Sequence, residues 1–485
     1  MSTEIPAPLE HRFRLLLPFF FTGQTDLSAL RHDTGKKSWT CWEQTPAPNL
    51  YQDESLPNVR EFLFGADKGS CRYWRVPADT ANVWFKNGGF FADAYQAADS
   101  DANGRPATFN VQLGDCGIEL FLSPHGCGVI SLCWQGNGEH ALNYWQECNY
   151  RVSQWREQTR YRFYLPYKPD YQTPPAEDAP FAQRLGQSGG SVDLVELVKF
   201  LLTPLDYQIM QEQFSVYSLT RFSHLDFSDS AIQHRLQASL SAFAHVEEFH
   251  HAGSVSLTQQ VLNPQHWAAV GSLGACHLLA DQLPLATGDN IPFNEQRLPI
   301  VLHKYFTAYL SALLQRVVLQ QVLNRARNSL SGDDKINAQE LSDLNEAVLK
   351  LMVNGYFIEI SSREALNQYY QLAQRGLRVS DNLSIVQRAL HDGEVTNNAR
   401  YQQEMLHDTN QNMRVVAHVQ GKLEWLEVLF ASYYVTSLVH YVLGDAHSIE
   451  EVITKAESHW LLIVAAILSG LGAFWFLKPH KLKKH

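Results

Sequence analysis

Several features that carry catalysis or metal binding in other proteins are missing from this chain of 485 residues. It contains no H-E-x-x-H pair and no glycine-rich phosphate loop of the G-x-x-x-x-G-K-[ST] type. Its seven cysteines form no C-x-x-C pair, so neither a zinc site nor a disulfide framework is indicated. We therefore name no catalytic, cofactor-binding or metal-ligating residue, and we expect a protein that is not an enzyme.

Basic runs are also scarce before the last few residues. The formal net charge is -11, with 39 Lys and Arg against 50 Asp and Glu. A nucleic-acid-binding surface needs clustered positive charge, so we expect no direct nucleic-acid partner. Hydrophobic residues make up 45% and charged residues 18%, which is typical of a folded chain long enough for two or three packed units.

The first part of the chain, residues 1–165, is rich in strand patterns. The apolar run 15–21 is short, is interrupted by Pro18 and lacks a small-residue cleavage site, so we interpret it as a buried strand and not as a secretory signal. The segment 117–134 has two apolar runs around a Ser-Pro-His-Gly turn, which predicts a hairpin. Further strands are predicted at REFLFG (60–65), CRYWRVPA (71–78) and NVWFKNGGFF (82–91).

Prolines and glycines between 166 and 192 indicate a linker or long loop. A mixed α/β segment follows at 193–300, including a strand-like stretch at 214–222. The segment 193–300 also contains a cluster of His and Glu residues, which can be interpreted either as a metal site or as the solvated face of a helix. The cluster consists of His245, Glu247, Glu248, His250 and His251.

Helical periodicity dominates from residue 301 to residue 425. The segment beginning at Tyr305 lacks Pro and Gly and predicts a long helix, and shorter helices follow at 337–357, 362–376 and 381–392. A last helix, from about 398, is expected to form a coiled-coil stalk that continues without a break past residue 425. The fold class is thus α+β, with a strand-rich N-terminal domain and a helical bundle.

Two apolar stretches near the C-terminus predict a transmembrane hairpin over 426–477. The stretch 460–477 contains no charged residue, and 426–443 approaches the same length but includes Glu427 and His440. Trp460 suits a membrane interface, and the basic tail 478–485 favours the cytoplasmic side. We expect an inner-membrane protein with two spans, both termini in the cytoplasm and the lipid bilayer as a partner; the tail anchors are Lys478, Lys481, Lys483 and Lys484.

The predicted first span carries a polar stripe. Ser432, Thr436 and His440 are spaced four residues apart, so they share one helix face. The stripe could line a pore in an oligomer, or it could act as polar contact between the two helices. The predicted outer loop is acidic, and Asp445, Glu450 and Glu451 would attract cations.

This organisation resembles that of CorA-like divalent-cation transporters over residues 300–485. The segments NGYFIEISSREALNQYYQLAQRGLRVSDNL and KLEWLEVLFASYYVTSLVHYV are similar to diverged bacterial members, some of which are membrane effectors in type III CRISPR and related anti-phage systems. The resemblance implies a homo-oligomer, a pentamer in that family, with a divalent cation as the transported ion. The family's Gly-Met-Asn signature is replaced here by Gly444-Asp445-Ala446, which puts magnesium selectivity in doubt.

Three functions are compatible with these patterns. The first is a CorA-like cation channel or transporter gated by a cytoplasmic body that senses a ligand, with a small nucleotide messenger as one candidate. The second is a membrane-anchored scaffold or signalling protein without a pore. The third, an enzyme tethered to the membrane, lacks any motif that would assign its residues.

Overall fold

The structure is a computed structural model that divides into two compact units, Met1–Gly393 and Glu394–His485. Each unit is considered by itself. The structure describes residues 5–21, 42–43, 46–65, 70–76, 90–94, 108–109, 111–137, 140–153, 161–166, 191–202, 205–211, 213–227, 229–246, 258–282, 297–331, 338–443, 450–451, 453–454, 460, 464 and 468.

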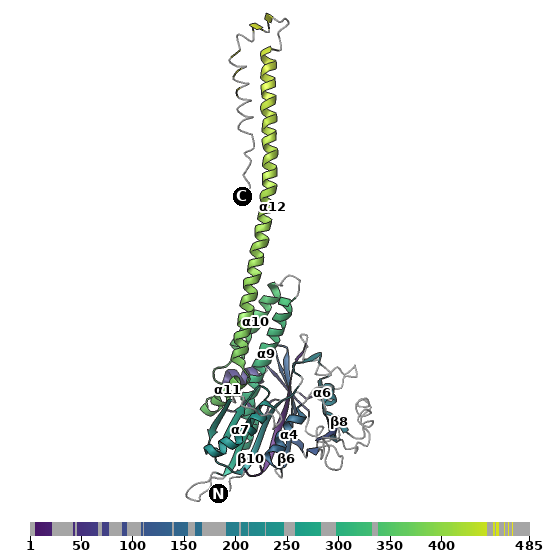
Figure 1. Ribbon diagram of the computed structural model, residues 1–485, viewed down its shortest axis with the longest axis vertical. Coiled ribbons are helices and arrows are strands. Elements are labelled where there is room, and N and C mark those ends of the chain that lie inside the picture. The colour runs from purple at the N-terminus through teal and green to yellow at the C-terminus, as the bar shows by residue number, and fades with distance from the viewer. Residues whose placement is uncertain are drawn as a thin grey trace. The chain divides into compact units, whose positions relative to one another are not determined.

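A nine-stranded mixed sheet forms the centre of the first unit (Figure 1). Among the described strand pairs, β10 and β13 run parallel and the other pairs are antiparallel. The order is β11 (Thr258–Asn263), β12 (His266–Val270), β13 (Gly274–Gln282), β10 (Ser215–His224), β1 (Glu10–Phe21), β6 (Cys127–Asn137), β5 (Gln112–Ser123) and β2 (Arg72–Arg75), with β9 (Tyr207–Ile209) also paired to β1.

Strand β1 lies in the middle of this sheet and is covered on both faces. Phe13, Leu15 and Leu17 belong to the hydrophobic core on one face, and Leu16 belongs to the core on the other. A strand buried on both sides is apolar without alternation, which explains the continuous run 15–21. The predicted buried strand is confirmed, and so is the hairpin, formed by β5 and β6.

Helices pack against both faces of the sheet. One core contains residues of α4 (Leu142–Val152), α6 (Leu194–Leu202) and α7 (Ser230–His245). The opposite core contains residues of α1 (Asn49–Gln52), α2 (Pro57–Phe64), η5 (Ile300–Tyr305), α9 (Phe306–Ser331), α10 (Ala338–Asn354) and α11 (Glu364–Gly376). A short turn of helix, α8 (Arg297–Pro299), precedes η5.

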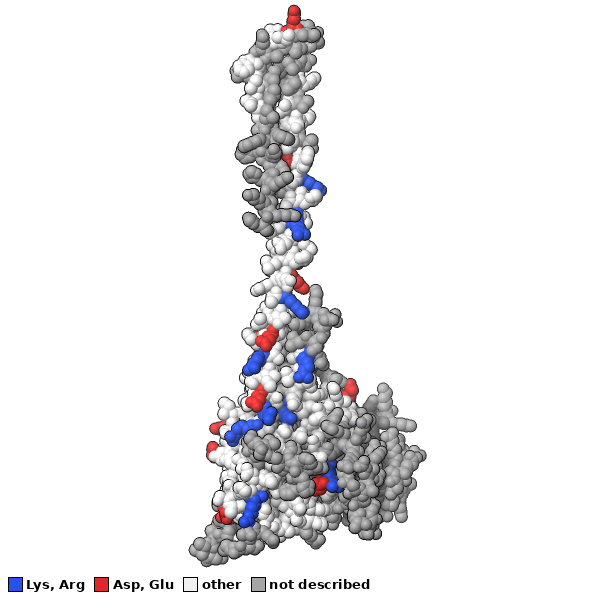
Figure 2. All heavy atoms as spheres, viewed as in Figure 1, with Lys and Arg blue, Asp and Glu red and all other residues white. Residues whose placement is uncertain are grey.

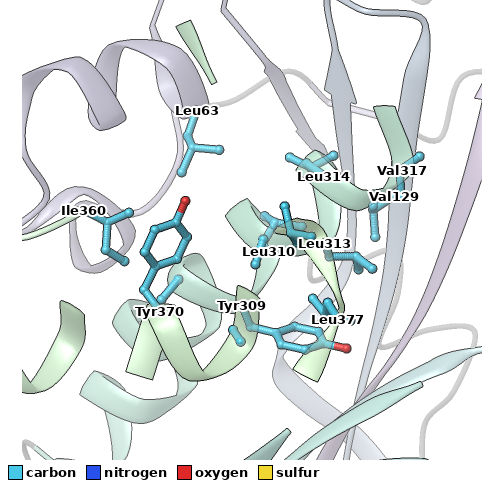
Figure 3. Close-up of a cluster of buried hydrophobic side chains, with 14 of the residues drawn as sticks. Leu63, Val129, Tyr309, Leu310, Leu313, Leu314, Val317, Ile360, Tyr370 and Leu377 are labelled. Atoms are coloured by element: carbon cyan, nitrogen blue, oxygen red, sulfur yellow. The ribbon is translucent and has the colours of Figure 1, made fainter. Parts of the chain in front are cut away.

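Helix α9 supplies the middle of the second core. Tyr309, Leu313 and Val317 are each fully buried, and Figure 3 shows Leu313 and Val317 near Val129 of strand β6. Because α9 contacts the sheet on one side and α10 and α11 on others, residues on every side of its first part, 306–315, are buried. The long helix predicted from Tyr305 is confirmed, and its first turn is the π-helix η5.

A smaller four-stranded sheet lies beside the linker segment. Its order is β4 (Thr108–Phe109), β3 (Phe90–Ala94), β7 (Tyr161–Pro166) and β8 (Ser191–Asp193). Strands β7 and β8 pair with each other across the sequence gap 167–190, which lies outside the described residues. Strands from before and after this segment also share the large sheet, since β1 pairs with β10.

The strand predicted at 60–65 is wrong, because these residues form part of helix α2. Pro57 occupies the first turn, where its missing N–H costs nothing, and Val59, Phe62 and Leu63 recur at helical spacing on the buried side. The strands predicted at 71–78 and 214–222 are confirmed as β2 and β10. Most of the segment 82–91 lies outside the described residues.

Helix α12, Val379–Leu443, is 65 residues long and uninterrupted (Figure 1). Its first residues belong to the first unit, where Val379, Val386 and Leu390 are buried. The predicted helices at 381–392 and from about 398 are therefore one element. The uninterrupted course past residue 425 is confirmed.

The predicted transmembrane hairpin over 426–477 is wrong, and so is the assignment to an inner membrane with two spans. No helix within the described part of the chain is both long enough and apolar enough to cross a bilayer. Polar and amphipathic side chains interrupt the end of α12, including Glu427, Tyr433, Tyr434 and His440. Of the second predicted span, 460–477, only residues 460, 464 and 468 are described.

Candidate functional site

The densest group of polar side chains in the first unit surrounds Arg14 on strand β1. Its guanidinium forms an ion pair with Glu119 of β5, and both side chains are almost completely buried. The carboxylate of Glu119 also accepts hydrogen bonds from the hydroxyls of Tyr51 and Tyr73, each at 2.8 Å. The guanidinium lies 3.8 Å from the ring centre of Phe306. The charges therefore satisfy each other inside the protein.

This network joins elements that are far apart in sequence. Nη2 of Arg14 contacts the Tyr51 hydroxyl at 2.9 Å and the backbone carbonyl of Leu302 at 3.0 Å. It thereby ties the sheet to α1 and to η5. A buried ion pair whose partners are all protein groups positions elements, and it offers no open face for a substrate. We interpret it as structural.

A second buried chain of hydrogen bonds crosses from the sheet to α11. His266 and His277 lie 2.9 Å apart through ring nitrogens, and the other nitrogen of His277 is 2.9 Å from the hydroxyl of Tyr369. Burial lowers the pKa of His266 to about 3, with the charge of Arg297 as a second cause. Burial, followed by the charge of His266, lowers the pKa of His277 well below its ordinary value. Both rings are neutral at pH 7, which suits a position in the core.

An open pocket of about 300 Å³ lies where the β5–β6 turn meets α9 and α10. Residues spaced by three or four positions on each helix share the facing surface. The lining consists of Pro124, His125, Val318, Gln321, Val322, Arg325, Asp343, Glu346, Ala347 and Lys350.

The chemistry of this pocket centres on His125, the turn histidine. Its Nε2 atom is buried and has no hydrogen-bond partner among the described residues. Burial, followed by the charge of Lys350, lowers the pKa of His125, so the ring is neutral at pH 7. Lys350 itself forms an ion pair of 2.6 Å with Glu346. A neutral imidazole between charges of both signs suits a small polar ligand better than a polyphosphate.

Helix α12 presents an apolar stripe within the second unit. Val416, Val419, Leu423, Leu426, Phe430 and Tyr433 alternate spacings of three and four residues, and each is between 49% and 67% exposed. This is the a and d pattern of a coiled coil. We call these six residues the α12 seam. Figure 2 shows Lys and Arg side chains interspersed with Asp and Glu along the part of the helix in view.

Two charged residues flank the α12 seam. Taking Val416 as position a, Lys422 occupies position g and Glu427 the following position e. No residue three or four positions away on the helix carries a charge opposite to either of them, and neither forms an ion pair among the described residues. In a parallel, in-register coiled coil a g residue faces the next e residue of the partner helix. Lys422 and Glu427 would therefore pair between two copies.

The predicted stripe residues Ser432, Thr436 and His440 all lie on α12, and Ser432 and His440 are exposed. Glu450 and Glu451 are exposed helical residues, and Trp460 is 55% exposed. Residues 445 and 478–485 lie outside the described part of the chain. The structure gives these residues no common site, so their predicted roles stay predictions.

The metal interpretation of the His245 cluster gains no support. His245 ends helix α7, and residues 247–251 lie outside the described part. Among the described residues, no three His, Cys, Asp or Glu side chains are placed so that they could hold a metal ion. The expectation that no motif points to an enzyme is wrong in one respect, because residues 186–190 read GQSGG and fit the G-x-S-x-G spacing of a hydrolase nucleophile turn. These residues also lie outside the described part of the chain. Sequence reasoning missed the pocket and the α12 seam, although the seam's spacing was available in the sequence.

Comparison with protein-family models, with curated proteins and with solved structures finds no match for this chain. The resemblance to CorA-like proteins, the cation channel that it implies and the absence of enzymatic activity thus stay predictions.

Proposed function

We propose that this protein is a homo-oligomeric scaffold or signalling protein whose copies assemble through helix α12. The observation that carries the proposal is the α12 seam, six large apolar side chains at coiled-coil spacing on an exposed helix. A long helix with such a stripe is poorly stable alone in water, because most helical stability in proteins comes from packing an apolar face. A second copy supplies a matching face.

The flanking charges support a parallel arrangement. Lys422 and Glu427 have no opposite charge within reach on their own helix, and a parallel partner in register provides one to each. In a parallel association, equivalent ends of the α12 helices also lie side by side. The N-terminal units would then be held near one another through the continuous helix, which is the arrangement a scaffold needs to bring bound partners together.

The number of copies is the quantity to measure first. Sedimentation equilibrium and light scattering on the full chain should give a mass that is a multiple of 55.1 kDa. Substituting Leu423→Asp and Leu426→Asp together puts charge into the seam, and each buried Leu contributes about 2 kcal/mol. We expect the variant to dissociate to monomers at concentrations where the parent chain is assembled.

Trp425→Asp is the matched control. Trp425 lies on the same turn, is 72% exposed and falls at position c, away from the seam. The control should leave the mass unchanged. A parent chain that is monomeric at tens of micromolar, or a control that dissociates as fully as the seam variant, would show the proposal to be wrong.

We propose a second activity, binding of a small polar molecule in the pocket beside His125. The unpartnered Nε2 atom supports it, because a buried polar atom without a partner is destabilising and a ligand can satisfy it. Thermal unfolding should be recorded with amino acids, with cyclic and linear nucleotides, and with neutral polar metabolites. A ligand of this site should raise the melting temperature of the parent chain but not of His125→Phe; Gln233→Ala, on helix α7, serves as control.

A further inference from the structure

Two cysteines face each other at an irregularity in the large sheet. Strands β5 and β6 pair at Leu113 with Trp134 and again at Ile118 with Leu132, so four residues of β5 stand opposite the single residue Cys133. Cys116 lies in this bulge. Bulges re-aim side chains and loosen pairing locally, which gives a sulfur atom in the bulge more freedom than one in a regular ladder.

The environment of the two thiols is unusual for a buried sheet. Contact between the side chains of Cys116 and Cys133 lowers the pKa of the Cys133 thiol and raises that of the Cys116 thiol. Nη2 of Arg14 lies 2.8 Å from Sγ of Cys116. Cys133 is 2% exposed, whereas Cys116 is half-buried, so Cys116 is on the more exposed side of the pair. A guanidinium beside a thiol pair favours a thiolate.

A second cysteine pair in the same unit provides an internal comparison. Cys71 and Cys127 are also neighbours, since the charge of Cys127 contributes to the raised pKa of Cys71, and both are fully buried. Burial raises the pKa of Cys127 to about 12 and raises that of Cys71 further. Neither is exposed to solvent, and no arginine among the described residues contributes to either pKa shift. This pair should be inert.

We propose that Cys116 and Cys133 form a dithiol site that hydrogen peroxide oxidises to an intramolecular disulfide. The Cys133 thiolate attacks one peroxide oxygen, so that an S–O bond forms, the O–O bond breaks, and hydroxide leaves and takes a proton to become water. The Cys116 sulfur then attacks the Cys133 sulfenic sulfur. An S–S bond forms, the S–O bond breaks, and a second water leaves with the Cys116 proton.

The backbone around Cys116 has room for this closure. Gly114 and Gly117 are the first and last residues of the bulge, and Gly117 has a φ of 61°, a region that other residues rarely adopt. At Gly114 an added Cβ would lie 2.8 Å from Sγ of Cys133, so only glycine lets the strand approach that sulfur. Closing the disulfide removes the Cys116 thiol from Arg14 and so alters the contacts of the buried ion pair.

The full chain itself provides the test. It should be exposed to graded hydrogen peroxide, denatured, alkylated and digested, and the cysteine peptides identified by mass spectrometry. We expect a linked 116–133 peptide that has lost two hydrogens, formed about tenfold faster than any loss of alkylation at Cys71 or Cys127. Equal oxidation of all the cysteines, or no link under conditions that modify the others, overturns the proposal.

Two variants separate the roles of the sulfurs. Cys116→Ser should leave a sulfenic acid on Cys133 that dimedone traps, whereas Cys133→Ala should leave Cys116 largely unmodified. Cys127→Ala is the control and should form the 116–133 link at the parent rate. Dimedone labelling of Cys116 in place of Cys133 would show the assigned order of attack to be wrong, and circular dichroism verifies that each variant is folded.

Discussion

At the scale of single residues, the buried charge of Arg14 depends on Glu119. The pair lies in the core and is almost completely buried, so its members are stable there only together. Tyr51 and Tyr73 add hydrogen bonds to the same carboxylate. Removing one charge leaves the other without compensation in a medium of low dielectric constant.

Substituting Glu119→Gln should therefore lower the free energy of unfolding by about 3–5 kcal/mol. Urea denaturation followed by far-ultraviolet circular dichroism measures it. Asp115→Asn is the matched control, because Asp115 contacts Arg12 at 3.1 Å but is 79% exposed. A surface pair contributes about 0–1 kcal/mol. Similar losses in the two variants would contradict the structural role assigned to the Arg14 pair.

Buried histidines make stability depend on pH. Burial lowers the pKa of His11 and of His303 to about 4 and that of His266 to about 3, against an ordinary value of 6.5. Below about pH 6.5 these histidines bind protons in the unfolded chain. In the folded chain the same histidines stay neutral until about pH 4. The free energy of unfolding should thus fall as the pH drops through this window, by up to about 1.4 kcal/mol per pH unit for each histidine.

Urea denaturation at pH 7.5, 6.5 and 5.5 measures this effect. The value should change little between the first two and fall clearly between the last two. A free energy of unfolding that stays constant or rises down to pH 5.5 would mean that these histidines are not buried as neutral rings.

At the scale of elements, close approach between strand and helix depends on particular small residues. At Gly136 of β6 an added Cβ would lie 2.1 Å from the ring of Trp145 on α4, and Trp145 is fully buried. The residue lets the helix pack directly on the strand. An alanine there must displace the indole or the backbone.

Gly136→Ala should lower the free energy of unfolding by about 1–3 kcal/mol, because the core must shift to accept the methyl group. Gly421→Ala is a suitable control. Gly421 is helical, has nothing within 4 Å of an added Cβ and lies off the seam. Alanine should stabilise that helix by about 1 kcal/mol. Equal effects of the two substitutions in urea denaturation would contradict the packing of α4 on β6.

At the scale of the whole molecule, the orientation of self-association depends on two charges. Lys422→Glu and Glu427→Lys should each weaken assembly, since each places like charges opposite one another in a parallel pair. The double variant restores the opposite-charge pairing. Each interhelical pair contributes about 0.5 kcal/mol at low salt, so the single variants should shift the midpoint of dissociation severalfold.

Analytical ultracentrifugation over a dilution series measures this midpoint for the three variants. Recovery in the double variant supports a parallel arrangement in register. Additive weakening in the double variant would instead indicate an antiparallel pairing or a different register. Association through the seam itself is tested separately by the Leu423 and Leu426 substitutions.

The local pattern of the sequence determined the elements whose periodicity is unambiguous. The β5–β6 hairpin has a strong turn sequence between apolar runs, and the helix from Tyr305 has neither Pro nor Gly. The α12 seam is likewise readable from spacing alone. Short apolar runs were less informative: the strand expected at 60–65 is helical, because its pattern of buried positions becomes visible only when Val59 is included.

Only the tertiary structure decided what depends on long-range contact. Arg14 and Glu119 are 105 positions apart in sequence, and Tyr51, Leu302 and Phe306 join them from three other elements. The pocket at His125 and the facing of Cys116 with Cys133 depend on helix packing and on a bulge, which leave no periodic signal. Periodicity reports which face of an element is buried, but the identity of the partner comes from how the elements pack together.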